Sequence, residues 1–207
     1  QAVPHMAVDV QEWGADFVAF SSHKMLGPTG VGVLWARKEL LEDMKPFNYG
    51  GEMISEVHLE KTLFKDPPHK FEAGTPDIGG VIGLGEAALY LTNIGMKRVR
   101  DHEIEIVGYA LTQLSGLPYI HLIGPKIPKT RGGVIAFTMD GAHPHDIAQL
   151  LNEDNICIRA GSHCAMPLHE YLHLPATARA SFYIYTTRSD VDMLIVGLKK
   201  IKKIFGN

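Results

Sequence analysis

The spacing of apolar residues changes once along the chain, and this change limits the available folds more than any other feature. In residues 79–91 and 96–114 the apolar residues recur at helical spacing, with Gly95 at the junction. After Gly116, short apolar segments alternate with helical ones. Such alternation predicts a small α/β sandwich in which a sheet packs against helices.

Four strands and two helices are expected in this second region. The strands are predicted at residues 120–122, 134–138, 156–159 and 180–185, and the helices at residues 143–153 and 189–204. The boundary with the first region is expected within the long helical connection, near residues 94–116.

The first region opens with a strand, a polar loop and a second strand. Residues 16–20 and 31–36 are short, apolar and rich in β-forming residues. Residues 38–44 are expected to form a short helix. Because residues 48–76 contain many glycines and prolines, we expect a long functional loop without regular structure there.

Composition excludes several classes of function. The 207 residues are 45% hydrophobic, enough to bury a core. The formal net charge is -3 without a basic stripe or acidic tail, so neither nucleic acid nor a membrane surface is an expected partner. No apolar stretch approaches the ~20 residues that span a bilayer, and the 2 cysteines suggest no disulfide scaffold. We expect a soluble, cytoplasmic protein.

Lys24 is the first candidate for chemistry, because it follows an apolar strand and precedes a glycine-containing turn. A lysine that bonds covalently to a cofactor needs a rigid element end and phosphate-binding donors nearby. Ser21 and His23 could supply those donors. A solvated surface lysine beside a turn has the same spacing, so Lys24 alone does not decide between the two interpretations.

The second candidate is Cys164, in the small-residue segment 159–167 that follows a predicted strand. A cysteine beside a histidine and near an arginine is suited to act as a sulfur nucleophile. The alternative is a small buried cysteine next to a turn. That alternative is our interpretation of Cys157, which lies between Ile156 and Ile158 in the predicted strand.

Arg179 stands just before the predicted strand 180–185. A guanidinium at a strand entrance is suited to bind a carboxylate through two hydrogen bonds, as an amino-acid substrate would require. An ordinary surface ion pair is the alternative interpretation.

A cluster of histidines near Cys164 was considered as a metal site. His163, His169 and His173 lie close to it in sequence, but the spacing fits no standard zinc pattern. No metal site is therefore predicted.

Two segments together, residues 21–30 and 159–167, resemble the aminotransferase class V group. Within it they are most similar to the SufS-type (group II) cysteine desulfurases, also called selenocysteine lyases. The resemblance covers essentially the whole chain. Further matching segments are residues 1–3, 50–54, 71–76 and 179–181.

The resemblance implies pyridoxal 5'-phosphate (PLP) as cofactor. Lys24 would bind it covalently and later move protons at the α-carbon of the substrate. Ser21 and His23 would bind the phosphate, and Gln1 would contact an oxygen on the pyridoxal ring. Thr75 would reach the phosphate of the neighbouring subunit's cofactor, which makes a homodimer part of the prediction.

The resemblance also implies the substrate and the reaction. Cys164 would attack the sulfur of L-cysteine and become a persulfide, releasing L-alanine. Arg179 would hold the substrate carboxylate, Arg159 would line the same pocket, and His163 would be an auxiliary proton-transfer group. A SufE-like or SufU-like acceptor would take the sulfur to iron–sulfur cluster assembly.

The fold implied is α/β, the PLP-dependent transferase type I fold. Residues 1–93 would be the C-terminal part of the PLP-binding large domain, with a mainly parallel sheet. Residues 94–207 would be the small C-terminal domain carrying the catalytic cysteine loop.

The start of the chain at Gln1 is interpreted as a cut inside a longer protein, because no initiator methionine precedes a patterned segment. The family carries upstream an aspartate that pairs with the pyridinium nitrogen and a histidine that stacks on the ring. We therefore expect little or no desulfurase activity from this chain alone.

Two other functions are kept as alternatives. One is a non-catalytic remnant or interaction module that no longer binds PLP. The other is a class V transaminase, which is disfavoured because such an enzyme needs no loop cysteine.

Overall fold

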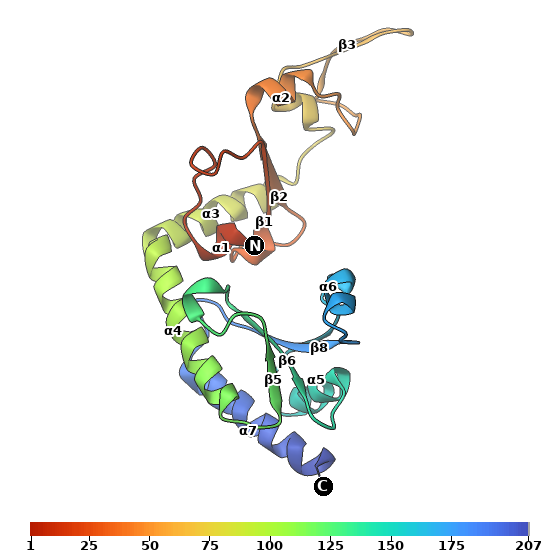
Figure 1. The fold of residues 1–207 in the computed structure, drawn as a ribbon. Coiled ribbons are helices and arrows are strands. Elements are labelled where there is room, and N and C mark those ends of the chain that lie inside the picture. Colours follow the sequence, from red (N-terminus) through yellow and green to blue (C-terminus); the bar gives the residue numbers. More distant parts are fainter. Residues whose placement is uncertain (207) are drawn as a thin grey trace. The chain divides into compact units, whose positions relative to one another are not determined.

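The computed structural model describes residues 1–206 and divides into two compact units (Figure 1). The N-terminal unit covers residues 1–97, and the C-terminal unit begins at Arg98. This division lies close to the expected boundary after residue 93. Each unit is described by itself.

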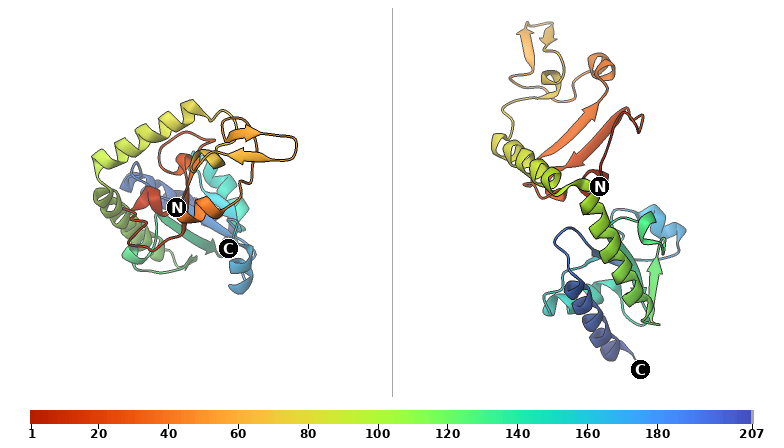
Figure 2. Two further views of the ribbon diagram at one scale, coloured as in Figure 1. Left: turned by 90° about the horizontal axis from the view of Figure 1, so that it is seen from above. Right: turned by 90° about the vertical axis from the view of Figure 1, so that its left-hand side faces the viewer.

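The N-terminal unit is built on a β-hairpin (Figures 1 and 2). After the short helix α1 (Ala2–His5), strand β1 (Phe17–Ser21) pairs antiparallel with β2 (Gly32–Ala36), in a register that joins Ser21 to Gly32. The connection begins with the 3-10 helix η1 (Ser22–Lys24). The predicted order of strand, polar loop and strand is confirmed.

The loop expected at residues 48–76 is only partly irregular. Strands β3 (Ile54–Val57) and β4 (Thr62–Phe64) form a second antiparallel hairpin, followed by the 3-10 helix η2 (His69–Phe71). The glycines and prolines flank this hairpin rather than interrupt it, which is why their number alone gave the wrong prediction. The predicted short helix is present as α2 (Lys38–Asp43).

The expectation of a mainly parallel sheet is wrong for the residues that the structure describes. Each of the paired strands within residues 1–206 runs antiparallel to its neighbour. In the N-terminal unit the connections between paired strands are too short for the crossover that a parallel pair needs.

Helix α3 (Ile78–Ile94) begins at the cap Asp77, whose carboxylate accepts a hydrogen bond from Gly80 N at 2.9 Å. Glycines on its first turns allow a close approach to the β1–β2 connection. A Cβ atom added to Gly80 would collide with Val31, and one added to Gly83 would lie 3.0 Å from Pro28 Cγ. The segment that follows Lys24 is thereby held against α3.

The C-terminal unit is a four-stranded antiparallel sheet in the order β5-β6-β8-β7, packed against helices. The strands are β5 (Ile120–Ile123), β6 (Val134–Met139), β7 (Arg159–Gly161) and β8 (Thr177–Ser181). The helices are α4 (Met96–Ser115), α5 (Pro144–Glu153), α6 (Met166–Tyr171) and α7 (Arg188–Phe205). A short 3-10 helix, η3 (Pro128–Thr130), precedes β6. The predicted sheet-and-helix sandwich is confirmed.

One face of this sheet forms the core. Ile135 and Phe137 of β6 are fully buried and lie opposite Ala180 and Ala178 of β8. These residues pack with the apolar faces of α4, α5 and α7 (Figure 1). Because side chains alternate along a strand, Thr177 and Arg179 point to the other face.

Strands β7 and β8 lie a few residues from their predicted positions. Residues 156–159 were expected as a strand, but Ile156 lies just beyond α5 and its N–H donates to Leu151 O of that helix. Residues 182–185 were expected to belong to the other strand, but Thr186 N donates to Tyr183 O in a turn. A capping box between Thr187 and Asp190 then starts α7.

Within residues 1–206, no single helix is long and apolar enough to cross a bilayer. Helices α3 and α4 meet the length and composition criteria only when taken together as a bent pair.

Candidate active site

The first group of candidate residues follows strand β1. Ser21 ends the strand, and His23 and Lys24 form the exposed end of η1. The turn is close-packed at its base, because a Cβ atom added to Gly27 would collide with the hydroxyl of Ser22. Lys24 therefore stands close after the end of a strand, on a closely packed turn.

The chemistry of this segment suits an anionic ligand with an aldehyde. Residues 21–30 contain two serine hydroxyls, a histidine and a lysine but no acidic side chain. The buried hydroxyl of Ser22 has no hydrogen-bond partner in the described part of the chain. The Lys24 amine likewise forms no hydrogen bond or ion pair with residues 1–206. Donors without a hydrogen-bond partner are suited to bind a phosphate, and a lysine amine is suited to bond to an aldehyde.

Gln1 and Thr75 are also in the N-terminal unit, and both are exposed. Gln1 is the N-cap of α1, and Thr75 precedes the cap of α3. No side-chain hydrogen bond joins either residue to the Lys24 segment within residues 1–206. Their predicted roles stay predictions.

The second group of candidates lies on the open face of the C-terminal sheet. Arg159 of β7 and Arg179 of β8 are direct register partners, so both guanidinium groups belong to the same face. Neither arginine forms an ion pair with an acidic residue of the described chain. Like charges placed opposite each other destabilise a sheet, so this pair is arranged to meet an anion.

Burial strengthens this electrostatic arrangement. Arg179 is half-buried, and its Nε atom is buried without a hydrogen-bond partner among residues 1–206. Burial, followed by the charge of Arg159, lowers the pKa of Arg179 from its usual value. A carboxylate bound here would relieve both the repulsion and the unmet hydrogen bond.

Cys164 lies in the connection from β7 to α6, and its thiol is exposed. The connection contains a turn in which Ala165 N donates to Ser162 O at 2.9 Å. His163 and Cys164 have φ angles of 54° and 63°, in the left-handed region that non-glycine residues seldom adopt. The loop is therefore held in a specific, strained shape, as functional loops often are.

An arginine contacts the sulfur directly. Arg159 Nη2 donates to Cys164 Sγ at 3.5 Å. The nearby cation stabilises negative charge on the sulfur, as a nucleophilic thiolate requires. Arg159, His163 and Cys164, with their loop neighbours, line an open hollow of about 510 Å³.

The ring of His163 is hydrogen-bonded to Thr177 of β8. Its Nε2 atom lies 2.9 Å from Thr177 Oγ1 and 3.0 Å from Thr177 O. Its Nδ1 atom is buried without a hydrogen-bond partner among residues 1–206. Burial, and then the charge of Arg179, lowers the pKa of His163 below its ordinary value of 6.5, so the ring stays neutral over a wider pH range.

Sequence reasoning missed Thr177, which joins the site by its position on the same sheet face as Arg179. The strand was predicted to begin at residue 180, whereas β8 begins at Thr177, which is 1% exposed. His169 was considered only as a metal ligand, yet it is buried and contacts Thr177. No group of three or more metal-ligating side chains comes together among residues 1–206.

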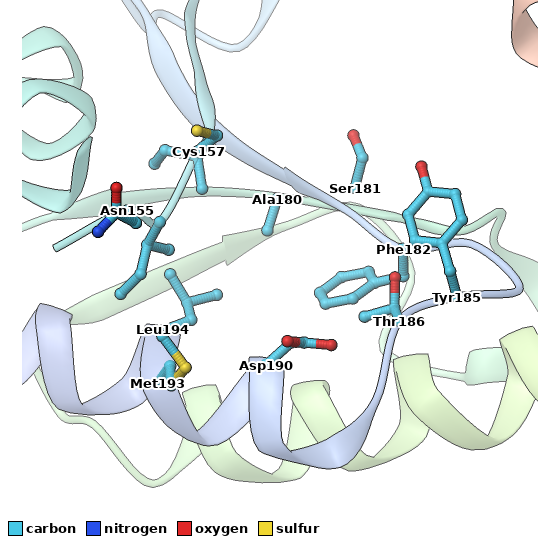
Figure 3. A pocket seen from close by; sticks show the side chains of 12 residues that line it. Asn155, Cys157, Ala180, Ser181, Phe182, Tyr185, Thr186, Asp190, Met193 and Leu194 are labelled. Carbon is cyan, nitrogen blue, oxygen red and sulfur yellow. The ribbon is translucent and has the colours of Figure 1, made fainter.

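The interpretation of Cys157 as a buried strand residue is wrong. Cys157 is exposed and lies outside the strands. It lines a separate pocket of about 390 Å³ between residues 155–158, the end of β8 and the start of α7 (Figure 3). None of the predicted site residues lines this pocket, and the pairing of β7 with β8 stops before Cys157, which opens the space.

The comparison with known protein families identifies the chain. The Aminotransferase class-V family matches residues 1–194. The chain belongs to this family.

Curated relatives of the chain carry one name in common. A protein of Streptomyces coelicolor named "Probable cysteine desulfurase" is 49% identical over 206 residues, which are 100% of this chain and 49% of that protein. A protein of Halobacterium salinarum with the same name is 50% identical over 99% of this chain and 49% of its own length. The chain thus spans about half the length of the curated relatives it matches.

Solved structures give the same result for the fold. The cysteine desulfurase CsdA from Escherichia coli matches with a TM-score of 0.92 and 37% identity, over 99% of this chain and 50% of that one. The apo cysteine desulfurase from Thermococcus onnurineus matches with a TM-score of 0.94 and 38% identity, over 98% and 51%. The predicted fold class is confirmed.

Proposed function

We propose that this chain is part of a PLP-dependent cysteine desulfurase, which converts L-cysteine to L-alanine and keeps the sulfur as a persulfide on Cys164. The observation that carries the proposal is the arrangement of Cys164 beside two arginines that have no acidic partner. The names of the relatives support the same assignment.

PLP would be held by the N-terminal unit. Lys24 would bond to its aldehyde carbon, and the donors on Ser21 and His23 would bind its phosphate. When bound, PLP supplies an electron sink for reactions at the α-carbon of an amino acid. The remaining assignments, Gln1 to the ring oxygen and Thr75 to a neighbouring subunit's phosphate, rest on the family resemblance.

Arg179 and Arg159 would bind and orient the substrate carboxylate. The two guanidinium groups share one sheet face, and Arg179 has a buried donor without a partner. Charge-assisted, two-pronged hydrogen bonds fix both the position and the direction of a carboxylate. L-cysteine held in this way has its side chain oriented for reaction, because its α-carbon substituents are fixed.

Cys164 would act as the nucleophile. Its sulfur attacks the sulfur of L-cysteine, so that an S–S bond forms while the substrate's Cβ–S bond breaks. The electron pair of the broken bond stays with the carbon fragment, which takes up a proton and leaves as L-alanine. Lys24 and His163 would hold and move the protons, His163 through its neutral ring.

Several finer assignments belong to this proposal. We infer a SufS-type enzyme because of the short Arg159–Cys164 loop, and we infer a cytoplasmic homodimer. The persulfide sulfur would pass to a SufE-like or SufU-like acceptor for iron–sulfur cluster assembly. An exposed Cys164 thiol is what such a transfer needs.

The alternative is a remnant that no longer binds PLP and serves as an interaction module. The Lys24 amine, which has no hydrogen bond or ion pair among residues 1–206, favours the enzyme, because a module that does not bind PLP does not need this lysine. A transaminase is disfavoured by the cysteine loop and its arginine contact.

The test is detection of the persulfide. After incubation with PLP and L-cysteine, alkylation and mass spectrometry should find one added sulfur atom on Cys164. Cys157→Ala serves as the matched control and should keep the modification, whereas Cys164→Ala should lose it. Sulfur added to Cys157 instead, or unchanged labelling in Cys164→Ala, would contradict the proposal.

Turnover is a separate matter. We expect the 207-residue chain alone to release little L-alanine, no more than one molecule for each persulfide, which should form slowly and stay on Cys164 without an acceptor. Rapid alanine release by this chain would overturn that expectation and leave the assignment of Cys164 intact.

A further inference from the structure

Three residues from three elements form a buried chain of hydrogen bonds under the cysteine loop. His169 of α6 places Nε2 3.2 Å from Thr177 Oγ1, and His163 places Nε2 2.9 Å from the same oxygen. The two imidazole rings lie 5.9 Å apart. His169 and Thr177 are 8% and 1% exposed, so water does not compete for these bonds.

The positions of the protons follow from which atoms can donate. His169 Nδ1 lies 3.1 Å from Ala165 O, and a carbonyl oxygen only accepts, so Nδ1 carries the hydrogen. In neutral His169 the Nε2 atom is then an acceptor. It accepts a hydrogen bond from the Thr177 hydroxyl, whose only hydrogen is then engaged. Toward His163, Thr177 Oγ1 can therefore only accept a hydrogen bond.

His163 is thereby restricted to one tautomer. Its Nε2 atom faces Thr177 O at 3.0 Å as well as the hydroxyl oxygen, and both now accept. Nε2 must therefore carry the hydrogen, and Nδ1 keeps the lone pair. If His163 Nε2 were unprotonated, its lone pair would face the carbonyl oxygen of Thr177, and that contact would be repulsive.

We propose that His169 and Thr177 are positioning residues that hold His163 in the Nε2–H tautomer, with Nδ1 as the free proton acceptor. The consequence for catalysis rests on the proposed function, since it assigns the proton-accepting atom of that site. Neither residue needs to touch the substrate. Their effect is to decide which ring nitrogen of His163 can take a proton.

The surroundings of His163 favour a neutral ring. Arg179, Arg159 and His169 are the charged or titratable groups that act on it, and each of them lowers its pKa, after the larger effect of burial. A hydrogen bond to the carbonyl of Thr177 acts in the opposite direction. A neutral ring has one proton and one lone pair, so the choice of tautomer determines its chemistry.

The role of His169 can be separated from simple packing. Without His169, the hydroxyl of Thr177 is free to rotate and donate to His163 Nε2, which favours the opposite tautomer. Replacing Thr177 by the similarly shaped valine removes that donor and leaves only the carbonyl acceptor. His169→Leu should therefore disturb the tautomer, and adding Thr177→Val should restore it.

The test is ¹H–¹⁵N NMR of the histidine side chains in the 207-residue chain at pH 8, with the His163 signals assigned from His163→Gln. In the unmodified chain His163 should show the Nε2–H pattern. In His169→Leu the ratio of Nε2–H to Nδ1–H forms should fall about fivefold, the effect of one hydrogen bond. His169→Leu with Thr177→Val should return to the original pattern, and His169→Leu with Thr177→Ser should not.

An unchanged tautomer in His169→Leu, or a double variant that stays disturbed, would overturn the proposal. If His169→Leu does not fold, His169→Met offers a flexible apolar replacement for the same comparison. The NMR measurement needs neither cofactor nor turnover. A His163 tautomer that behaves as expected in a chain whose Cys164 takes up no sulfur would leave the tautomer assignment standing and count against the proposed function alone.

Discussion

At the scale of single residues, several groups of the candidate site lack an ion-pair or hydrogen-bond partner among the described residues. Arg159 and Arg179 face each other without an acidic partner, and buried donor atoms remain on Arg179 and Ser22. Unmet buried polar groups cost stability. Under the proposed function, bound ligands would supply the missing partners of these groups.

His163 gives a prediction for pH dependence. Its pKa is lowered in the folded chain, so the folded state favours the neutral ring whereas an unfolded chain takes up a proton below about pH 6.5. The contribution of His163 to folding stability is present above about pH 6.5. It is lost as the pH falls toward the lower pKa that His163 has in the folded chain. Acidification from pH 8 to pH 5.5 should therefore reduce the free energy of unfolding more in the unmodified chain than in His163→Gln.

Urea unfolding at the two pH values measures this difference. His173→Asn is the control, because His173 is exposed and asparagine tolerates its φ of 55°. This control should lose as much stability on acidification as the unmodified chain. Equal pH dependence in His163→Gln and the unmodified chain would show that His163 is not the group responsible.

Some residues could be assigned from the sequence and others could not. Lys24, Cys164 and Arg179 could be proposed because each follows or begins an apolar segment that could be recognised. Thr177 could not be found, since its role depends on the register of β8, which places it opposite Gly161, and on the fold of α6. Cys157 was misplaced because the strand boundary beside it was misplaced.

At the scale of elements, helices were predicted better than strand ends. The helices at 79–91 and 96–114 were found within a few residues of α3 and α4, because helical periodicity accumulates over many residues. Strands β7 and β8 are only 3 and 5 residues long. Their limits are set by pairing partners rather than by local pattern, so the sequence placed them a few residues away.

The start of α7 gives a prediction at this scale. Thr187 Oγ1 accepts from Asp190 N at 3.3 Å, and Asp190 Oδ2 accepts from Thr187 N at 2.7 Å. These bonds satisfy backbone donors that a helix start leaves unpaired. Thr187→Ala should lower the free energy of unfolding by about 1 kcal/mol.

Chemical denaturation provides the measurement, with Ser189→Ala as the matched control, because Ser189 is an exposed residue in the first turn of α7. The control should change stability by less than about 0.5 kcal/mol. A loss in Ser189→Ala equal to that in Thr187→Ala would mean that the capping box contributes nothing specific.

At the scale of the whole molecule, the two candidate groups lie in separate units. Lys24 and its donors belong to residues 1–97, whereas Cys164 and both arginines belong to the unit that begins at Arg98. The family match runs through both units, and the chain covers about half of its curated relatives. The central claim is therefore that this chain keeps the lysine that captures PLP and the cysteine that takes the sulfur.

The most direct measurement is an absorbance scan of the purified 207-residue chain with added PLP, compared with Lys24→Ala. Lys45→Ala is the control, since Lys45 is an exposed lysine of the same unit outside the candidate site. The account predicts a cofactor band in the unmodified chain and in Lys45→Ala that is absent in Lys24→Ala. A band that survives Lys24→Ala, or no band in the unmodified chain, would contradict it.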